Sequence, residues 1–389
     1  MTSPQRSSYE VVIIGGGVIG LFTAHFLSQH MDPGKILVVD RGFATGGASG
    51  RNGGGVRQQW ETRATIRLAR ESVEFYRRFG RDFGYNPWFR QGGYLFLAFT
   101  EEEVITLRRM ETGVRSEGLP IRYLEPSSVL DVVPDLDVRS VRGATYLASD
   151  GVILPFPVVW GLLASLKERG VEVLYRTAVR AIDSDGHQVR AISTEGGRIS
   201  TPKVVNAAGG WSREINLIAG VPTITHPTLH EILATEPLTP FLDPMVVTLS
   251  RGTYFSQTMR GEVVGGLTMD HSRSTRTGLY SSREFLVEMS KELYRLVPRL
   301  AEARILRAWS GYYDDSPDGL PLLGEDPKLG GFFHANGFGG HGFMLAPSAT
   351  RRVAQMVLGQ KTDLDPAWIS PARFSKPGEA RTVEGLSLG

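Results

Sequence analysis

The sequence predicts an α/β protein whose chain begins with a Rossmann-like βαβ unit, and three observations support this. Residues 11–14, Val-Val-Ile-Ile, form an uninterrupted apolar run, as expected of a parallel strand covered on both faces. Glycines 15, 17 and 20 follow with the spacing G-x-G-x-x-G. A second apolar run at 36–39 ends in Asp40. Strand, glycine turn, helix, strand and terminal acid therefore occur in the order that binds a dinucleotide.

Each part of this unit has a physical role. Gly15 permits the tight turn, Gly17 lets a pyrophosphate approach the backbone, and Gly20 lets the helix pack closely on the strand. Val18 and Ile19 open a helix whose free N–H groups and partial positive charge suit that pyrophosphate. An acid at the end of the second strand is placed to bind a ribose, and Arg41 follows it. The unit alone does not separate NAD from FAD.

Composition narrows the class of protein. A length of 389 residues predicts two domains, and a formal net charge of +2 gives no field for nucleic acid or an acidic membrane. The absence of cysteine excludes disulfides, thiolate catalysis, cysteine-based metal sites and a cofactor tethered through sulfur. No His or carboxylate motif has ligand spacing, so we expect no metal. The apolar run 11–27 is too short and too interrupted by glycine to span a bilayer, and we expect a cytoplasmic protein.

Residues 46–55, GGASGRNGGG, contain six glycines and return towards the same crevice. One interpretation is a backbone on which a long rigid cofactor lies, with Ser49 and amide groups facing phosphate; the other is a flexible surface loop. Two distant segments favour the first. Residues 203–211, KVVNAAGGW, read as a buried strand ending in small residues. Residues 332–358 read as a strand, a glycine turn and a helix over 343–358, whose N-terminus suits the charge of a reduced flavin.

These motifs, together with SPDGLPLLGE and GFGGHGFMLAP, occur in the order seen in the D-amino-acid oxidase superfamily of FAD enzymes, which the chain resembles from about residue 9 to 358. It looks most like the sarcosine oxidase and glycine oxidase branch, and it also resembles the β subunits of sarcosine oxidases and of dye-linked L-proline dehydrogenases. The resemblance implies a Rossmann-like FAD-binding domain, 1–83, 150–215 and 325–389. This is interleaved with an α+β substrate domain, 84–149 and 216–324, built on a mostly antiparallel sheet.

The sequence agrees with this division. Strand-like runs with glycine and proline punctuation occur in the expected substrate domain, for example GGYLFLAF, HEILATEP and RGEVVGGLTM. Residues 61–83 have helical periodicity with one apolar face, which carries Ile66, Ala69, Val73, Tyr76, Phe79 and Phe83. The FAD contacts that follow from the motifs and the resemblance are Gly15, Gly17, Val18, Ile19, Gly20, Asp40, Arg41, Ala48, Ser49, Arg51, Asn52, Gly53, Gly54, Val179, Ala208, Gly209, Trp211, Gly311, Gly337, Gly339, Gly340, His341, Gly342, Phe343 and Met344.

At the substrate end the resemblance implies that Arg57 holds a substrate carboxylate, and its forked guanidinium suits bidentate capture. The alternative is a surface arginine. Tyr254 is expected on a strand near the ligand or else in the core, and His341 either touches the flavin or shapes its loop. His230 and Glu231 are expected to be structural.

The chain departs from its relatives at three positions. Glycine and D-amino-acid oxidases carry an arginine where Tyr313 stands, and monomeric sarcosine oxidases carry lysines where Met344 and Val263 stand. The pocket is therefore expected to be less cationic and more apolar, which favours secondary amines with some hydrocarbon.

The function predicted is oxidation of the C–N bond of sarcosine-like N-methyl or secondary amino acids by noncovalent FAD, giving an imine and, with O2, hydrogen peroxide. One alternative is the catalytic β subunit of a dye-linked L-proline dehydrogenase, which passes electrons to a partner subunit. An alternative of another class is a noncatalytic FAD-binding assembly factor.

Overall fold

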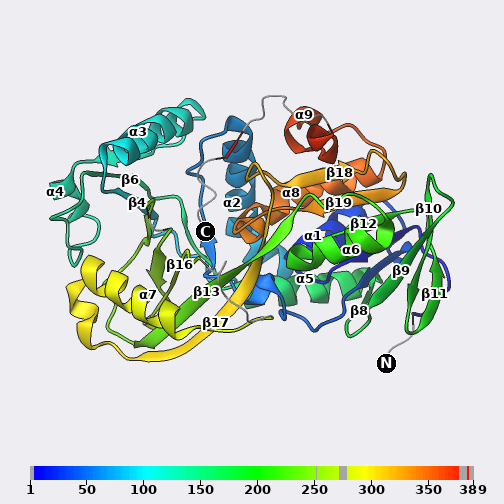
Figure 1. The fold of residues 1–389 in the computed structure, drawn as a ribbon, viewed down its shortest axis with the longest axis horizontal. Helices are drawn as coiled ribbons and strands as arrows, with labels where there is room; N and C mark the ends of the chain where they lie inside the picture. Colours follow the sequence, from blue (N-terminus) through cyan, green and yellow to red (C-terminus); the bar gives the residue numbers. More distant parts are fainter. Residues whose placement is uncertain (1–3, 251, 271–277, 376–382, 385–389) are drawn as a thin grey trace.

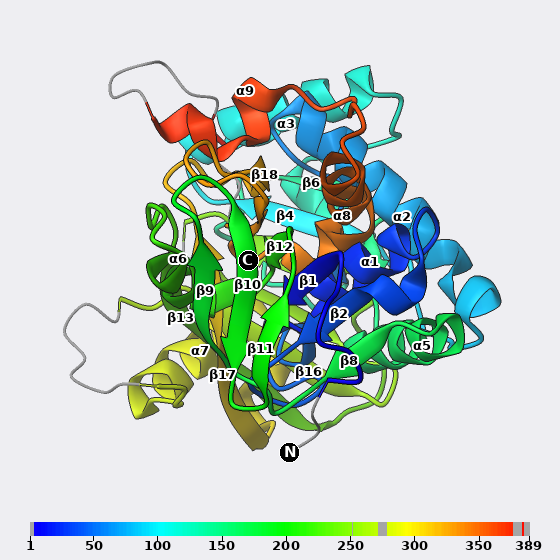
Figure 2. The ribbon, with the colours of Figure 1, turned by 90° about the vertical axis from the view of Figure 1, so that its right-hand side faces the viewer.

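The computed structural model describes residues 4–250, 252–270, 278–375 and 383–384, which form two halves built on two large sheets (Figures 1 and 2). One sheet has six strands and the other has eight. The six-stranded sheet has the order β18-β19-β12-β1-β2-β8 and is parallel except for β18. Its strands are β1 (Val11–Ile14), β2 (Ile36–Val39), β8 (Glu172–Leu174), β12 (Val204–Asn206), β18 (Leu322–Glu325) and β19 (Phe332–Asn336).

Both faces of this sheet are covered, which explains why β1 and β2 contain only apolar residues. Val11 and Ile13 of β1 pack in the cluster that contains the helices, whereas Val12 and Ile14 pack against a three-stranded sheet. The helices are α1 (Val18–Leu27), α2 (Arg63–Phe83), α5 (Pro155–Arg169) and α8 (Gly342–Val357). The smaller sheet consists of β9 (Val179–Ser184), β10 (Val189–Thr194) and β11 (Gly197–Ser200), and α6 (Ser212–Ala219) lies near it (Figure 2).

The eight-stranded sheet has the order β17-β13-β16-β15-β14-β4-β6-β5, and all its pairs are antiparallel except β14 with β4. Helices α3 (Glu101–Ser116), α4 (Pro126–Val129) and α7 (Arg283–Leu296) lie in this half (Figure 1). Its strands are β4 (Tyr94–Ala98), β5 (Arg122–Leu124), β6 (Gly143–Leu147), β13 (His226–Pro237), β14 (Met245–Thr248), β15 (Tyr254–Gln257), β16 (Glu262–Leu267) and β17 (Ile305–Asp315).

The predicted fold class is confirmed, because a mostly parallel sheet and a mostly antiparallel sheet are built from interleaved segments. The exact domain boundaries stay a prediction; β18, for example, begins at Leu322, ahead of the predicted boundary at residue 325. Two short strands, β3 (Gly55–Val56) and β7 (Gly151–Val152), pair with each other where the chain passes between the halves.

Helix α2 forms as its sequence predicts. Thr62 caps the first turn by accepting a hydrogen bond from the backbone N–H of Thr65, and Gly84 ends the helix in the left-handed region at φ 71°. Its apolar face is buried from Ile66 to Phe79.

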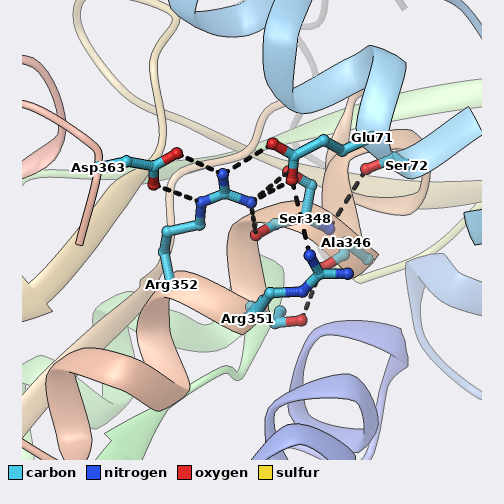
Figure 3. A network of polar contacts seen from close by, with 8 residues as sticks. Glu71, Ser72, Ala346, Ser348, Arg351, Arg352 and Asp363 are labelled. Atoms are coloured by element: carbon cyan, nitrogen blue, oxygen red, sulfur yellow. Dashed lines mark hydrogen bonds and ion pairs between the residues drawn. The ribbon is translucent and has the colours of Figure 1, made fainter. Parts of the chain in front are cut away.

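A polar clamp joins α2 to α8 (Figure 3). Buried Arg352 donates both terminal nitrogens to Glu71, at 2.8 Å for Nη2 to Oε1, and also reaches Asp363 at 2.7 Å. Burial opposes its charge, yet the two carboxylates hold the pKa of Arg352 above its ordinary value. The clamp fixes the position of α8, whose N-terminus reaches the candidate site.

Candidate functional site

A long cleft lies at the ends of β1 and β2 and extends to the face of the eight-stranded sheet. Its walls come from segments that are far apart in the chain: the turn after β1, the glycine loop, the segment after β12, strands of the large sheet, and the turn before α8. The lining residues are Gly15–Ile19, Asp40, Phe43, Thr45–Ser49, Arg51–Gly55, Tyr94, Ala207–Trp211, His230, Ile232, Met245, Tyr254, Gly311–Asp314, Ala335, Phe338, Gly339, Gly340 and Gly342–Met344.

The turn after β1 brings bare backbone to the cleft. Gly15 has φ 118°, and a Cβ built there would lie 2.2 Å from the carbonyl oxygen of Ala207. The Asp40 carboxylate accepts the Gly16 N–H at 2.7 Å, and the Ser49 hydroxyl accepts the Val18 N–H at 2.8 Å. The Asp40 carboxylate and the glycine loop are thus both hydrogen-bonded to the backbone at the start of α1.

The glycine loop is held in place by its own polar side chains. Arg51 donates Nε to the Gly46 carbonyl at 2.8 Å and Nη1 to the Ser310 carbonyl of β17 at 3.1 Å. Asn52 donates to the Ser49 carbonyl at 2.9 Å and accepts from the Gly54 N–H at 2.8 Å. These bonds fix the loop against the large sheet, so it is not a detached surface turn.

The last three glycines of this loop make room for neighbouring groups. Gly54 has φ 75°, and a Cβ there would lie 2.1 Å from the Ile153 carbonyl oxygen. A Cβ on Gly55 would lie 1.7 Å from the Tyr94 hydroxyl, and one on Gly53 would lie 3.1 Å from the ring of Tyr254. The loop therefore packs directly on the tyrosines of the opposite wall.

That wall is aromatic and apolar. The His230 ring stacks on Tyr313 at 4.4 Å between centroids and on Tyr254 at 5.6 Å. Burial raises the pKa of Tyr254, Tyr313 and Tyr94 above the ordinary value, so all three hydroxyls are protonated at neutral pH. Ile232, Met245 and Met344 supply the apolar part of the same wall. We call the seven residues Tyr94, His230, Ile232, Met245, Tyr254, Tyr313 and Met344 the substrate wall.

Arg57 and His341 are buried next to this wall and do not line the cleft among the described residues. Arg57 donates Nη1 to the Gln59 carbonyl at 2.9 Å and contacts His341 Nε2 through Nη2 at 3.3 Å. Its guanidinium carbon lies 3.8 Å from the ring centre of Trp60. Burial lowers the pKa of Arg57 to about 10, which leaves it a cation at neutral pH, and it interacts electrostatically with Tyr94 and Tyr313.

The sequence of this chain is similar to those of known flavoenzymes along nearly its whole length. A family model described as FAD dependent oxidoreductase (DAO) matches residues 10–356. The chain belongs to the DAO family. Sarcosine oxidase subunit beta of Arthrobacter sp. is 28% identical over 95% of this chain and 92% of that protein.

Two solved structures are also similar to this chain. The L-proline dehydrogenase of P. horikoshii is 33% identical and covers 95% of this chain and 98% of its own, with a TM-score of 0.88. Glycine oxidase of Geobacillus kaustophilus is 26% identical and covers 94% and 98%, with a TM-score of 0.85. The predicted resemblance is confirmed, and FAD is the cofactor of this DAO-family chain.

The geometry of the cleft also fits FAD, independently of the similarity to known proteins. Two helix N-termini reach it, at Gly17–Ile19 and at Gly342–Met344. Among the described residues, neither N-cap, Gly17 nor His341, caps its helix through a side-chain hydrogen bond. Backbone N–H groups and a positive dipole are thus presented at both ends, as an anionic pyrophosphate and a flavin that gains charge require.

Most of the predicted contacts line the cleft of this DAO-family chain, and six predicted residues do not. Gly20 lies under the turn, where a Cβ would be 1.9 Å from the Gly15 carbonyl oxygen, and Val179 opens β9 in the smaller sheet. Arg41 is exposed and pairs with Glu214, and Gly337 donates its N–H to Asp314. Arg57 and His341, described above, are the remaining two.

Sequence reasoning missed several lining residues, chiefly Tyr94, Ile232, Met245 and Phe338. Their positions depend on how the strands pair: Met245 of β14 stands beside Tyr94 of the parallel strand β4, and His230 of β13 stands opposite Gly311 of β17. No group of three or more metal-ligating side chains occurs within the described residues, and no helix in that part of the chain is both long and apolar enough to cross a membrane.

Proposed function

We propose that this chain oxidises the C–N bond of small N-methyl or secondary amino acids, such as sarcosine, to imines, using noncovalently bound FAD. The observation that supports this most is the substrate wall, which presents three protonated tyrosines and apolar side chains opposite the glycine loop. The hydrocarbon of an N-methyl group or ring packs well on such a wall, and the apolar surroundings favour the neutral amine over its ammonium form.

The protein's own residues bind and orient the amino acid. The Tyr254 hydroxyl, which accepts a hydrogen bond from Tyr313, offers its own O–H to the substrate carboxylate, and Arg57 supplies positive charge from its buried position beside them. Met344, Met245 and Ile232 exclude water from the reacting end. Bound FAD supplies the two-electron acceptor, held by the two helix N-termini, Asp40 and the glycine loop.

A second candidate is a dehydrogenase subunit that passes electrons to a partner, acting on L-proline. The similarity to the P. horikoshii L-proline dehydrogenase, over nearly the whole of both chains, favours it. A protonated tyrosine wall with apolar neighbours also suits a pyrrolidine ring. The two candidates share the site and differ in the electron acceptor.

The purified chain, reconstituted with FAD, tests both. Anaerobic bleaching of the flavin by sarcosine, N-methylated amino acids, L-proline, glycine and D-alanine identifies the substrate class, and peroxide release in air identifies oxygen as acceptor. Bleaching by a secondary amino acid with peroxide supports the oxidase; bleaching without peroxide supports the partner-dependent dehydrogenase. A flavin that no amino acid bleaches contradicts both and favours a noncatalytic FAD protein.

A further inference from the structure

A buried carboxylate that touches no part of the cleft organises the residues after the glycine loop. Asp150 is fully buried just before β7. Its Oδ1 accepts two hydrogen bonds from Gln58, from the backbone N–H at 2.8 Å and from Nε2 at 3.0 Å. Its Oδ2 accepts Nε2 of Gln59 at 3.0 Å. One side chain therefore holds both glutamines that follow Arg57.

The side chain of Gln59 has no rotational freedom in this arrangement. Its Nε2 also donates to the Tyr94 carbonyl at 3.0 Å, and its Oε1 accepts the Thr145 hydroxyl at 2.9 Å. Both amide hydrogens and the amide oxygen thus have partners on three different segments. Asp150 fixes which way the amide points, because only the nitrogen end can face a carboxylate.

Gln59 in turn holds Arg57. The Gln59 carbonyl accepts Arg57 Nη1 at 2.9 Å, while Nη2 contacts His341 and the guanidinium lies on Trp60. Gln59 therefore links Asp150 to the guanidinium beside the substrate wall: its side-chain amide bonds Asp150, and its backbone carbonyl accepts from Arg57.

Asp150 also supplies charge. The groups that favour the charged form of Arg57 include Tyr94, Glu384, Asp150 and Tyr313, and of these Glu384 and Asp150 are carboxyl groups. Burial raises the pKa of Asp150 to about 7, against the opposing effect of its glutamine donors and of Arg57. Above that pH Asp150 is a carboxylate, and its charge and that of Arg57 each make the other less costly to bury.

We propose that Asp150 is a positioning residue for amino-acid binding: acting through Gln59, it fixes the Arg57 guanidinium beside the substrate wall and balances its charge. The effect on substrate rests on the proposed function, but the placement of Arg57 does not.

The test compares the FAD-loaded wild type with Asp150→Asn. The asparagine can direct an amide N–H₂ at Gln59 Nε2, so two donors face each other and Gln59 must turn. We expect the crystal structure of the variant to show Arg57 Nη1 detached from the Gln59 carbonyl. We expect KM for the amino acid that bleaches the flavin to rise about tenfold, with kcat changed less than about threefold, since one charge-assisted contact in binding is worth about a factor of ten or more.

Asp326→Asn is the matched control, because Asp326 is also a buried carboxylate and bonds His334 at 2.9 Å away from Arg57. It should lower the melting temperature and leave KM and Arg57 unchanged. The double variant Gln59→Glu with Asp150→Asn returns a carboxylate that faces an amide donor, and should recover part of the lost affinity.

An unmoved Arg57 in Asp150→Asn, or an increase in KM no larger than that of Asp326→Asn, overturns the proposal. If Asp150→Asn does not fold, Thr145→Val removes one bond to Gln59 at lower cost and should raise KM by about threefold with kcat unchanged; no increase then overturns it. If the wild type oxidises no amino acid, the proposed function fails, and the crystal structures alone still decide whether Asp150 places Arg57.

Discussion

At Gly55 a missing side chain makes room for a hydroxyl group of the opposite domain. Because a Cβ there would lie 1.7 Å from the Tyr94 oxygen, Gly55→Ala must displace Tyr94 or the glycine loop. We expect a loss of about 1–3 kcal/mol in the free energy of unfolding, as for other overpacked sites, together with weaker FAD binding. Urea denaturation and FAD titration measure both. Adding Tyr94→Phe should restore most of the loss, and failure of this rescue would place the strain elsewhere.

Tyr254 contributes a buried hydroxyl group to the substrate wall. Burial keeps it protonated, and it hydrogen-bonds Tyr313 in the substrate wall. If the Tyr254 hydroxyl donates a hydrogen bond to the substrate carboxylate, Tyr254→Phe should raise KM about 10-fold or more, since a hydrogen bond to a charged group is worth about 1.5–3 kcal/mol. Steady-state kinetics check this, with Tyr280→Phe, outside the cleft, as the control. An unchanged KM would remove Tyr254 from the binding residues.

Helices α2 and α8 are joined by apolar packing and by one buried arginine, Arg352. Glu71→Gln leaves Arg352 paired with Asp363 alone, and because Glu71 is itself about one-third exposed we expect a loss of about 1–3 kcal/mol in the free energy of unfolding. Glu74→Gln, three residues along α2, removes only the exposed pair with Arg77 and should cost about 0.5 kcal/mol or less. Urea midpoints of the two variants compare the pairs directly. Equal losses would show that the Arg352 clamp contributes no more to the free energy of unfolding than the exposed pair does.

The elements also show what the sequence can predict. The βαβ unit was predictable because strand, turn, helix and acid lie within 30 residues, and the structure has β1, α1 and β2 where the pattern places them. Helices α2 and α8 followed from periodicity and glycine punctuation in the same way. The substrate wall was predictable only in part: Tyr254, Tyr313 and Met344 were expected at the site, whereas Tyr94, Ile232 and Met245 were not. Strands β4 and β14 are buried throughout, so they have no alternation to tell which side chains face the cleft.

Arg57 shows the same limit of prediction from sequence. Its position after the glycine loop and its resemblance to a carboxylate-binding arginine led to a role at the ligand, and that role stays a prediction. Its guanidinium lies on Trp60 and Phe96 and within electrostatic reach of Asp150, and the chain brings Phe96 and Asp150 there only when both halves have folded. Spacing in the sequence carries no information on that arrangement.

For the whole molecule, the join between the two halves contains two carboxyl groups whose burial costs stability. Burial raises the pKa of Asp150 and of Asp314 from 3.8 to about 7. The folded protein therefore holds protons that the unfolded chain releases above about pH 4, so these two groups make the free energy of unfolding fall as pH rises from about 4 to 7. Each group can contribute up to about 4 kcal/mol to that fall. Carboxylates held by arginine, such as Glu71, act in the opposite direction but below this window. His25 acts in the opposite direction within it, because burial lowers its pKa to about 4 and the unfolded chain therefore binds the extra proton, but this effect is smaller than that of the two carboxyl groups together.

Urea midpoints measured from pH 5 to pH 8 with saturating FAD test this. The wild type should lose stability across the range, and Asp314→Asn, which removes the titrating group while its amide oxygen still accepts the Gly337 N–H, should lose less. Asp326→Asn removes a carboxyl whose pKa lies below its usual value, so it should lower the midpoint equally at both ends and leave the slope unchanged. An Asp314→Asn midpoint that falls with pH as steeply as that of the wild type would show that Asp314 is not buried in its neutral form, and that the two halves meet around a charge that is balanced in some other way.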